Sequence, residues 1–340
     1  MTMILPTDPT YPLLPVFLFL ALVLCLIPLP WHIQAWNAGT CAFMVWVALW
    51  CLNGFVNALV WRGNLNNPAP VWCDISTKFE IGATIGIPAA ILCISRRIYS
   101  LVSGSSKAYN DKRRMIMIDL SICLGFPVII MILHYVVQDH RFDILEDVGC
   151  QAVTYNTPLA YVLVHMWPVV FGVISLIYSA LTFRVFYLRR SEFNRFNESR
   201  TSINLKRYSR LGIFACLDVV CTVPLGIYSI YAGPRSSTLH QWVSWDETHA
   251  NFSRIRFIPT SEWRNDPAVH FSVELMRWLH VFCALLFFVA FGLTADARQY
   301  YRGLFSRIFH GPGHHSRHPS QHIDSTALDS KGSTGFLRPP

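Results

Sequence analysis

Charged residues are scarce in this 340-residue chain, where Asp, Glu, Lys and Arg together make up only 14% of the sequence. A soluble globular domain carries about 25% charged residues. Hydrophobic residues reach 53%, and the mean hydropathy is +0.36. The shortage of charge therefore argues against an ordinary soluble domain and indicates a membrane protein.

Several catalytic and transport signatures are missing as well. The chain has no HExxH motif, no GxSxG motif, no carboxylate-rich metal motif and no clear internal repeat, so a transporter built from inverted repeats is not supported. The last apolar run, 269–293, contains no Lys, which argues against a retinal protein, since that class needs a Schiff-base lysine there. One enzyme stays open as an alternative, a seven-helix membrane hydrolase with metal ligands from His134, His165, Asp218 and His280. Otherwise we expect neither a cofactor nor a bound metal.

Long apolar runs are what the sequence does have. A helix that crosses a bilayer needs about 20 apolar residues, because every backbone amide must be paired inside the segment. Seven runs of this length predict an all-α membrane protein with a bundle of seven transmembrane helices. They lie at about 11–29, 36–61, 71–98, 115–138, 159–187, 209–231 and 269–293.

The first of these runs is expected to stay in the protein. No Lys or Arg precedes it and no clear small-residue cleavage site follows it, whereas a signal peptide has both. Residues 1–10 are then a short leader ahead of the helical domain, 11–293. The remainder, 294–340, is a tail rich in His, Ser, Gly and Pro near its end, which we expect to be largely disordered.

Basic residues set the expected orientation. With the amino terminus outside, sixteen Lys or Arg lie near inner helix ends and six near outer ends. The positive-inside rule then places the amino terminus outside and the tail in the cytoplasm. Such charge fits contact with anionic lipid of the inner leaflet or with an acidic partner, and it argues against nucleic acid binding.

Two of the ten cysteines fall on the expected outer side. Cys73 lies at the start of the third run, and Cys150 lies in the loop after the fourth. A disulfide between them would tie that loop over the mouth of the bundle. Two free thiols are the alternative, because the sequence does not show how closely the two Cα atoms approach.

Four ionisable residues are expected to share one layer of the bundle. Counting 1.5 Å per residue from the outer ends of the third and seventh helices, Lys78, Glu80, Glu274 and Arg277 lie at similar depth. Charges at such depth are costly unless they face inward and pair. Lys78 with Glu274 and Glu80 with Arg277 are the simplest pairs across the helices, and Asp74 with Lys78 within one helix. A polar ligand pocket and a structural network of ion pairs both fit this layer.

Three further features are of lower specificity. Pro168 and Pro224 lie within helices and are candidate hinges, because each removes a backbone hydrogen bond. Asn251 begins an Asn-Phe-Ser triplet in the long loop 232–268 and is a candidate glycosylation site. The histidines between 310 and 322 have no fixed spacing for a metal, so we treat them as part of the tail.

Specific stretches resemble a known family. The segment PVWCDISTKFEIGATIGIPAAILCISRRIY at 70–99 is similar to the third helix of fungal mating-pheromone receptors of the a-factor type. The stretch PWHIQAWNAGT at 30–40 resembles their first inner turn, and ELMRWLHVFCALLFFVAFGLTADARQYYR at 274–302 resembles their seventh helix. The resemblance covers about 11–303, and the tryptophans and the long loop before the seventh helix suit a basidiomycete-like member.

The resemblance implies a G-protein-coupled receptor in the fungal plasma membrane. Its ligand would be a secreted peptide pheromone with a farnesylated carboxy-terminal Cys, and binding would signal through a heterotrimeric G protein to the mating response. Whether such a receptor forms a homodimer is left open. Candidate contacts to the G protein are the basic residues of the inner loops, namely Arg96, Arg97, Arg189, Arg190, Lys206, Arg207 and Arg210.

Overall fold

The computed structural model describes residues 8–103, 112–188 and 238–293, and the isolated residues Gly212, Gly226, Ile227 and Arg298. Statements on structure below refer to these residues. The chain divides into two compact units, Met1–Ala297 and Arg298–Pro340, and the fold described here is that of the first. The expected helix at 209–231 and the expected tail fall outside the described residues, apart from those isolated positions.

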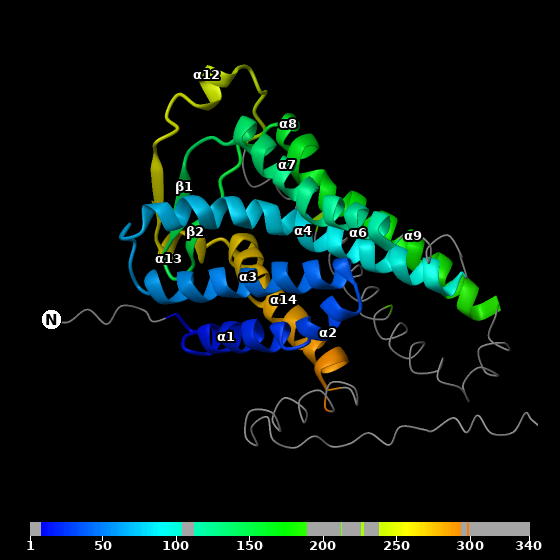
Figure 1. The fold of residues 1–340 in the computed structure, drawn as a ribbon. Helices are drawn as coiled ribbons and strands as arrows, with labels where there is room; N and C mark the ends of the chain where they lie inside the picture. The colour runs from blue at the N-terminus through cyan, green and yellow to red at the C-terminus, as the bar shows by residue number, and fades with distance from the viewer. Residues whose placement is uncertain are drawn as a thin grey trace, which may run out of the picture. The chain divides into compact units, whose positions relative to one another are not determined.

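Helices dominate the first unit (Figure 1). In chain order the elements are α1 (Leu13–Leu26), α2 (Leu29–Gln34), α3 (Ala38–Val60), α4 (Pro70–Val102), α6 (Lys112–Leu120), η1 (Ser121–Gly125), α7 (Phe126–His134), η2 (Tyr135–Val137), β1 (Phe142–Leu145), β2 (Gly149–Gln151), α8 (Pro158–Ala160), η3 (Tyr161–His165), α9 (Met166–Leu188), α12 (Trp245–Thr248), β3 (Ile255–Ile258), α13 (Thr260–Trp263) and α14 (Pro267–Gly292).

Six helical stretches among the described residues are long and apolar enough to cross a membrane. They are Leu13–Gln34, Ala38–Val60, Pro70–Val102, Lys112–Val137, Pro158–Leu188 and Pro267–Gly292. The first of them differs from the expected 11–29, because helix continues as α2 through the stretch that was expected to be an inner turn.

Prolines mark where three of these helices begin. Pro70, Pro158 and Pro267 each occupy the first helical position, where a missing N–H costs nothing and φ is already fixed near the helical value. The Asp266 side chain also accepts hydrogen bonds from the backbone N–H groups of Ala268 and Val269, which caps the start of α14.

Proline inside a helix is compensated by a neighbouring side chain. Pro127 of α7 has no N–H to donate to the carbonyl of Cys123, four residues earlier. The indole Nε1 of Trp46, on α3, donates to that carbonyl at 2.9 Å instead. The Trp46 ring lies so close to Gly86 of α4 that an added Cβ would stand 2.3 Å from it, so glycine is required there for α3, α4 and the η1–α7 segment to pack.

Helix α4 is the centre of the bundle. Within its most apolar stretch 72% of the residues are buried, against 22–44% for the other five candidate spans. It contacts α3 on one side and α7 and α9 on the other, while α1 packs on α3 and α14 (Figure 1). Side chains that α4 turns inward therefore reach almost every other helix.

A small sheet lies at the end of the bundle where α4 begins (Figure 1). Its strand order is β2-β1-β3, with β1 antiparallel to β2 and parallel to β3. Because β3 belongs to the loop before α14, the sheet joins two loops that are more than 100 residues apart. This sheet was not predicted from the sequence. This end of the bundle is called the disulfide end below.

Candidate functional site

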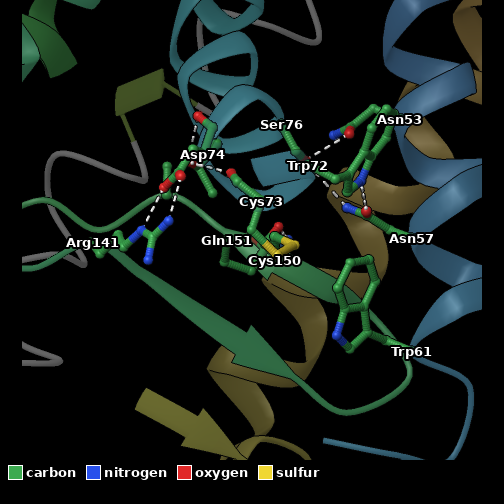
Figure 2. Close-up of a disulfide and its surroundings, with 12 residues drawn as sticks. Asn53, Asn57, Trp61, Trp72, Cys73, Asp74, Ser76, Arg141, Cys150 and Gln151 are labelled. Atoms are coloured by element: carbon green, nitrogen blue, oxygen red, sulfur yellow. Dashed lines mark hydrogen bonds and ion pairs between the residues drawn. A yellow bond between two sulfur atoms is a disulfide. The ribbon is translucent and has the colours of Figure 1, made fainter. Parts of the chain in front are cut away.

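Cys73 and Cys150 form a disulfide in this structure, with their Cα atoms 5.3 Å apart. Cys73 lies in the first turn of α4 and Cys150 lies in β2, so the bond fixes the sheet to the central helix. Figure 2 shows Trp61 and Trp72 beside it. Both sulfur-bearing residues are buried with Trp61, Phe142 and Ile144, and they form a packed support for the residues that follow along α4.

Asp74 pairs with Arg141 and not with Lys78, so the i, i+4 pair expected within this helix is wrong. The Arg141 guanidinium donates from Nε at 2.8 Å and from Nη2 at 2.6 Å to the two carboxylate oxygens (Figure 2). Such a two-pronged contact is stronger and more directional than a single hydrogen bond. It ties the start of α4 to the residue that precedes β1.

Lys78 faces the segment that ends α7. Its Nζ donates to Gln138 Oε1 at 2.6 Å and lies 3.1 Å from His134 Nδ1, and the Tyr135 ring centroid is 5.4 Å away. The expected pair between Lys78 and Glu274 is therefore not formed. An amide and an imidazole, instead of a carboxylate, contact this half-buried amine.

A polar cavity of about 220 Å³ opens at the disulfide end. Polar side chains from three helices and from β2 face it, among them Glu80 from α4 and Arg277 from α14. The lining residues are Leu14, Leu18, Trp50, Asn53, Gly54, Asn57, Ala58, Glu80, Val148, Gln151, Ser272, Val273, Met276 and Arg277. Of the four residues predicted to form a charged layer, two line this cavity, whereas Lys78 and Glu274 do not.

Glu80 and Arg277 share the cavity without pairing to each other. The Glu80 carboxylate accepts from the Ala152 backbone N–H at 3.0 Å, just beyond β2. The Arg277 guanidinium donates to Glu274 at 2.8 Å, one turn earlier on α14. The expected Glu80–Arg277 ion pair is therefore not formed, and one acidic group from α4 and one basic group from α14 line the same cavity.

Arg277 also holds the amino-terminal segment, which the sequence analysis missed. Its Nη2 donates to Asp8 Oδ2 at 2.9 Å and to the Asp147 carbonyl at 3.1 Å. Arg264 donates to the other oxygen of Asp8 at 3.1 Å. Nothing in the local sequence marks Asp8 for this role, because the two arginines that bind it lie more than 250 residues away.

An apolar cavity of about 200 Å³ lies farther along the same helices. Most of its described lining is aliphatic, and it includes two histidines, His165 and His280. The residues are Val47, Ile81, Ala83, Thr84, Ile87, Pro88, Val164, His165, Pro168, Gly226, Met276, Leu279, His280 and Cys283. Met276 lines both cavities, so the two adjoin. Trp50 of the polar cavity stacks on His280 of the apolar one, with ring centroids 4.0 Å apart.

His140 links the loop ahead of β1 to that strand. Its Nδ1 lies 2.7 Å from Asp139 Oδ2 and its Nε2 lies 2.6 Å from Asp143 Oδ1, and Arg254 contacts both Asp139 and the Nδ1 atom. A neutral imidazole has only one N–H, so both carboxylate contacts require the protonated ring. Although burial lowers the pKa of His140, the bonds to Asp143 and Asp139 raise it above its ordinary value.

This arrangement predicts a pH-dependent stability. A raised pKa means that the contribution is fully present below the unfolded value of about 6.5 and is lost as pH rises through the folded value. We expect the melting temperature of the purified chain to fall over that window, and His140→Gln to remove that fall. In the parent chain, the free energy of unfolding should fall by about 1.5 kcal/mol across this pH window, which is the value of a hydrogen bond to a charged group.

The control for this measurement is His240→Gln, since His240 is exposed and its ring bonds the neutral Thr238 hydroxyl. It should leave the pH dependence of the parent chain in place. An unchanged pH profile in His140→Gln would refute the assignment of the protonated ring.

Comparison with known proteins decides the family. A sequence model described as pheromone A receptor, STE3, matches residues 13–309. This chain belongs to the pheromone A receptor family. Similar proteins include the pheromone B alpha 3 receptor of Schizophyllum commune, 43% identical over 97% of this chain and 54% of the relative. Pheromone receptor 1 of Mycosarcoma maydis is 34% identical over 86% of this chain and 83% of the relative.

A yeast protein is also similar: the pheromone a factor receptor of Saccharomyces cerevisiae is 28% identical over 83% of this chain and 59% of the relative. The chain spans about half the length of the Schizophyllum receptors it matches, 54% and 49% for the pheromone B alpha 3 and alpha 2 receptors. Its six candidate spans fit a multi-pass membrane protein of this family.

Membership does not favour the alternative of a metal hydrolase, because the relatives are named as receptors and not as enzymes. Its proposed ligands are also engaged elsewhere. His134 contacts Lys78 and Thr154, and His280 stacks on Trp50. No group of three or more His, Cys, Asp or Glu that could hold a metal occurs in the described part of the chain, and Asp218 lies outside it.

Two of the basic residues predicted to meet a G protein lie at the opposite end of α4 in this receptor-family chain. Arg96 pairs with Asp119 of α6 at 2.5 Å, and Asp119 is buried. Arg97 donates to the carbonyls of Trp36 and Ala35, which end the α2 segment. Both arginines therefore hold neighbouring segments to α4 in this state.

The remaining candidates are placed as follows. Pro168 lies in α9 and lines the apolar cavity. Asn251 is exposed in the turn after α12, where its carbonyl accepts from Arg254. The other candidates lie outside the described residues, namely Pro224, Arg189, Arg190, Lys206, Arg207 and Arg210.

Proposed function

We propose that this chain is a plasma-membrane receptor for a secreted, farnesylated peptide pheromone and couples to a heterotrimeric G protein. The observation that carries the proposal is the pair of adjoining cavities inside a pheromone-receptor bundle, one polar and one apolar, which meet at Met276. A peptide that ends in a hydrocarbon chain has the same two parts in the same order.

The polar cavity receives the peptide. Glu80 from α4 and Arg277 from α14 bond ionic or dipolar groups, and Asn53, Gln151 and Ser272 offer neutral donors and acceptors. A site of this kind rejects ligands that leave its buried polar groups unpaired. The peptide sequence is therefore selected here.

The apolar cavity receives the farnesyl chain. Its walls on α4, α9 and α14 are mostly aliphatic, and burying hydrocarbon gains about 25 cal/mol per Å² of apolar surface removed from water. The prenyl group supplies affinity and the peptide supplies selectivity. Because Pro168 and Met276 belong to the wall, the occupied cavity favours one arrangement of α9 and α14 over another, as a ligand must do to shift a conformational equilibrium.

The disulfide end faces outside in this proposal, since a disulfide persists in an oxidising compartment. Arg96 and Arg97 then lie at the cytoplasmic end, with Arg189, Arg190, Lys206, Arg207 and Arg210 as further candidate contacts to the G protein. In this proposal the Arg96–Asp119 ion pair holds Arg96 away from the G protein, and activation frees it.

That role of the pair predicts the effect of Asp119→Asn. The amide cannot form the ion pair, and a hydrogen bond to a charged group is worth about 1.5–3 kcal/mol. We expect ligand-independent signalling in a mating reporter to rise about tenfold or more. The control is Asp246→Asn, which removes one exposed acid from α12 and should leave basal signalling unchanged. If Asp119→Asn had the same basal signalling as the parent chain, the Arg96–Asp119 ion pair would not restrain activation.

The proposed function is tested in a yeast strain that lacks its own receptor and carries a mating reporter. Cells that express this chain are challenged with farnesylated peptides and with the same peptides lacking the farnesyl group. A response to the farnesylated form alone supports the proposal. A chain that reaches the cell surface and responds to no peptide of either kind contradicts it.

A further inference from the structure

A short strap, residues 8–12, runs from the first described residue to the start of α1. Asp8 is its attachment point. Asp8 is 6% exposed, and its carboxylate is bound through both oxygens, by Arg264 at 3.1 Å and by Arg277 at 2.9 Å. Thr10 donates to it from N and from Oγ1. Two guanidinium groups from α14 and the segment before it thus form an occupied carboxylate site.

The strap is connected directly to the polar cavity. Arg277 binds Asp8 and also lines that cavity. The strap continues into α1, where Leu14 and Leu18 form another wall of the cavity. Its Tyr11 ring lies under the Arg62 guanidinium, 3.7 Å from ring centroid to Cζ. Movement of the strap therefore changes two walls of the polar cavity.

The charges around Asp8 allow it to leave. Three carboxylates, from Asp8, Asp147 and Glu274, face the two guanidinium groups of Arg264 and Arg277. When Asp8 departs, two acids balance two bases, so no buried charge is stranded. Burial raises the pKa of Asp147 and the nearby charge of Asp8 also raises it, while the bond from the Gly63 N–H lowers it.

We propose that Asp8 is a tethered occupant of a carboxylate-binding site on Arg264 and Arg277, and that an acidic group of the ligand takes its place and opens the strap over the polar cavity. This rests on the proposed function for the identity of the ligand, but not for the existence of the site. The exchange swaps one carboxylate for another on the same donors, so the charge balance of the cluster is preserved. It gives the site a preference for ligands that carry an anionic group.

The site is tested without any pheromone, on the purified chain in detergent. Ser272 lines the polar cavity, so Ser272→Cys provides a reporter thiol. The probes are an anionic sulfonate and a cationic ammonium methanethiosulfonate reagent, and the chain with Ser272 intact gives the background from native cysteines. Modification of residue 272 is followed by mass spectrometry.

Adding Asp8→Asn to the reporter chain should raise the rate at which the anionic reagent modifies residue 272 about tenfold. The loss of a hydrogen bond to a charged group shifts the equilibrium between the closed and the open strap by at least that factor. The cationic reagent should gain much less, because the vacated guanidinium groups attract the sulfonate. Asp8→Glu should restore slow modification, and Asp246→Asn, an exposed acid of α12, should have no effect.

If Asp8→Asn raised the modification rate by both reagents equally, or by neither, the proposed carboxylate site would be refuted. Modification of Cys51, which is fully buried in the parent fold, at the same raised rate would mean general opening and would also overturn it. These outcomes are separate from those of the receptor assay, because no signalling is measured.

Discussion

Replacing Leu279 by Trp is expected to remove most of the response to a farnesylated peptide while leaving the chain folded and at the cell surface. Leu279 lines the apolar cavity, and the larger indole occupies the space proposed for the prenyl chain. If about 100 Å² of hydrocarbon can no longer be buried, the loss is roughly 2.5 kcal/mol at 25 cal/mol per Å². The concentration for half-maximal response should then rise about 70-fold.

The matched control is Phe282→Trp on the same helix. Phe282 is 59% exposed, so its side chain points away from the core and the substitution adds a similar ring outside the cavity. Its response should equal that of the parent chain. Leu279→Phe, a smaller increase in volume, should give an intermediate loss, which separates filling of the cavity from misfolding.

The two cavities also predict how the loss depends on the ligand. A peptide without the farnesyl group should bind equally poorly to the parent chain and to Leu279→Trp, because neither complex buries a prenyl chain. A displacement assay on membranes with both forms of one peptide measures this directly. If Leu279→Trp weakened both peptides by the same factor, the apolar cavity would not be the prenyl site.

The helices could be read from the sequence because each is a local property. Apolar length marks α3 and α14, and the prolines at 70, 158 and 267 mark starts to within two residues of those expected. The expected inner turn at 30–35 is mostly helical, since α2 spans Leu29–Gln34. Two prolines nearby and little periodicity leave turn and helix hard to distinguish in the sequence there.

The partners of the charged residues could not be read in this way. Depth along a helix places Lys78 beside Glu274 and Glu80 beside Arg277, but it does not give the direction in which each side chain points. Lys78 turns to Gln138, and Glu80 turns to the backbone of residue 152. Those partners are brought into place by β1 and β2, short strands in loops without a clear alternating pattern.

Contacts between residues far apart in the chain also could not be predicted from the sequence. Asp8 meets Arg277 across 269 residues, and β1 pairs with β3 across a segment that contains two expected helices. The sequence marks Arg96 as a candidate contact to a G protein, but it does not show that Arg96 pairs with Asp119, a single acid within an apolar run. In each case one residue of the pair looks unremarkable in its own neighbourhood, because burial and packing create the interaction.

Loss of the Cys73–Cys150 disulfide is expected to have the largest effect on stability. The bond closes a sequence separation of 77 residues, for which the chain-entropy estimate is about 4.5 kcal/mol at 25 °C. Helices that stay inserted restrict the unfolded chain already, so we expect a loss of roughly 2–4 kcal/mol. The bond also fixes β2 beside the backbone N–H that binds Glu80, so its loss should loosen one wall of the polar cavity.

Cys73→Ser, Cys150→Ser and the double variant should lower the melting temperature of the purified chain by similar amounts, because each removes the same bond. Reduction of the parent chain by dithiothreitol should lower it equally and have no further effect on the double variant. Cys41→Ser, a half-buried cysteine of α3 outside the bridge, serves as the control and should change stability little. If the single variants differ greatly from the double variant, or if reduction leaves the parent unchanged, packing of the individual side chains and not the covalent link stabilises this end of the bundle.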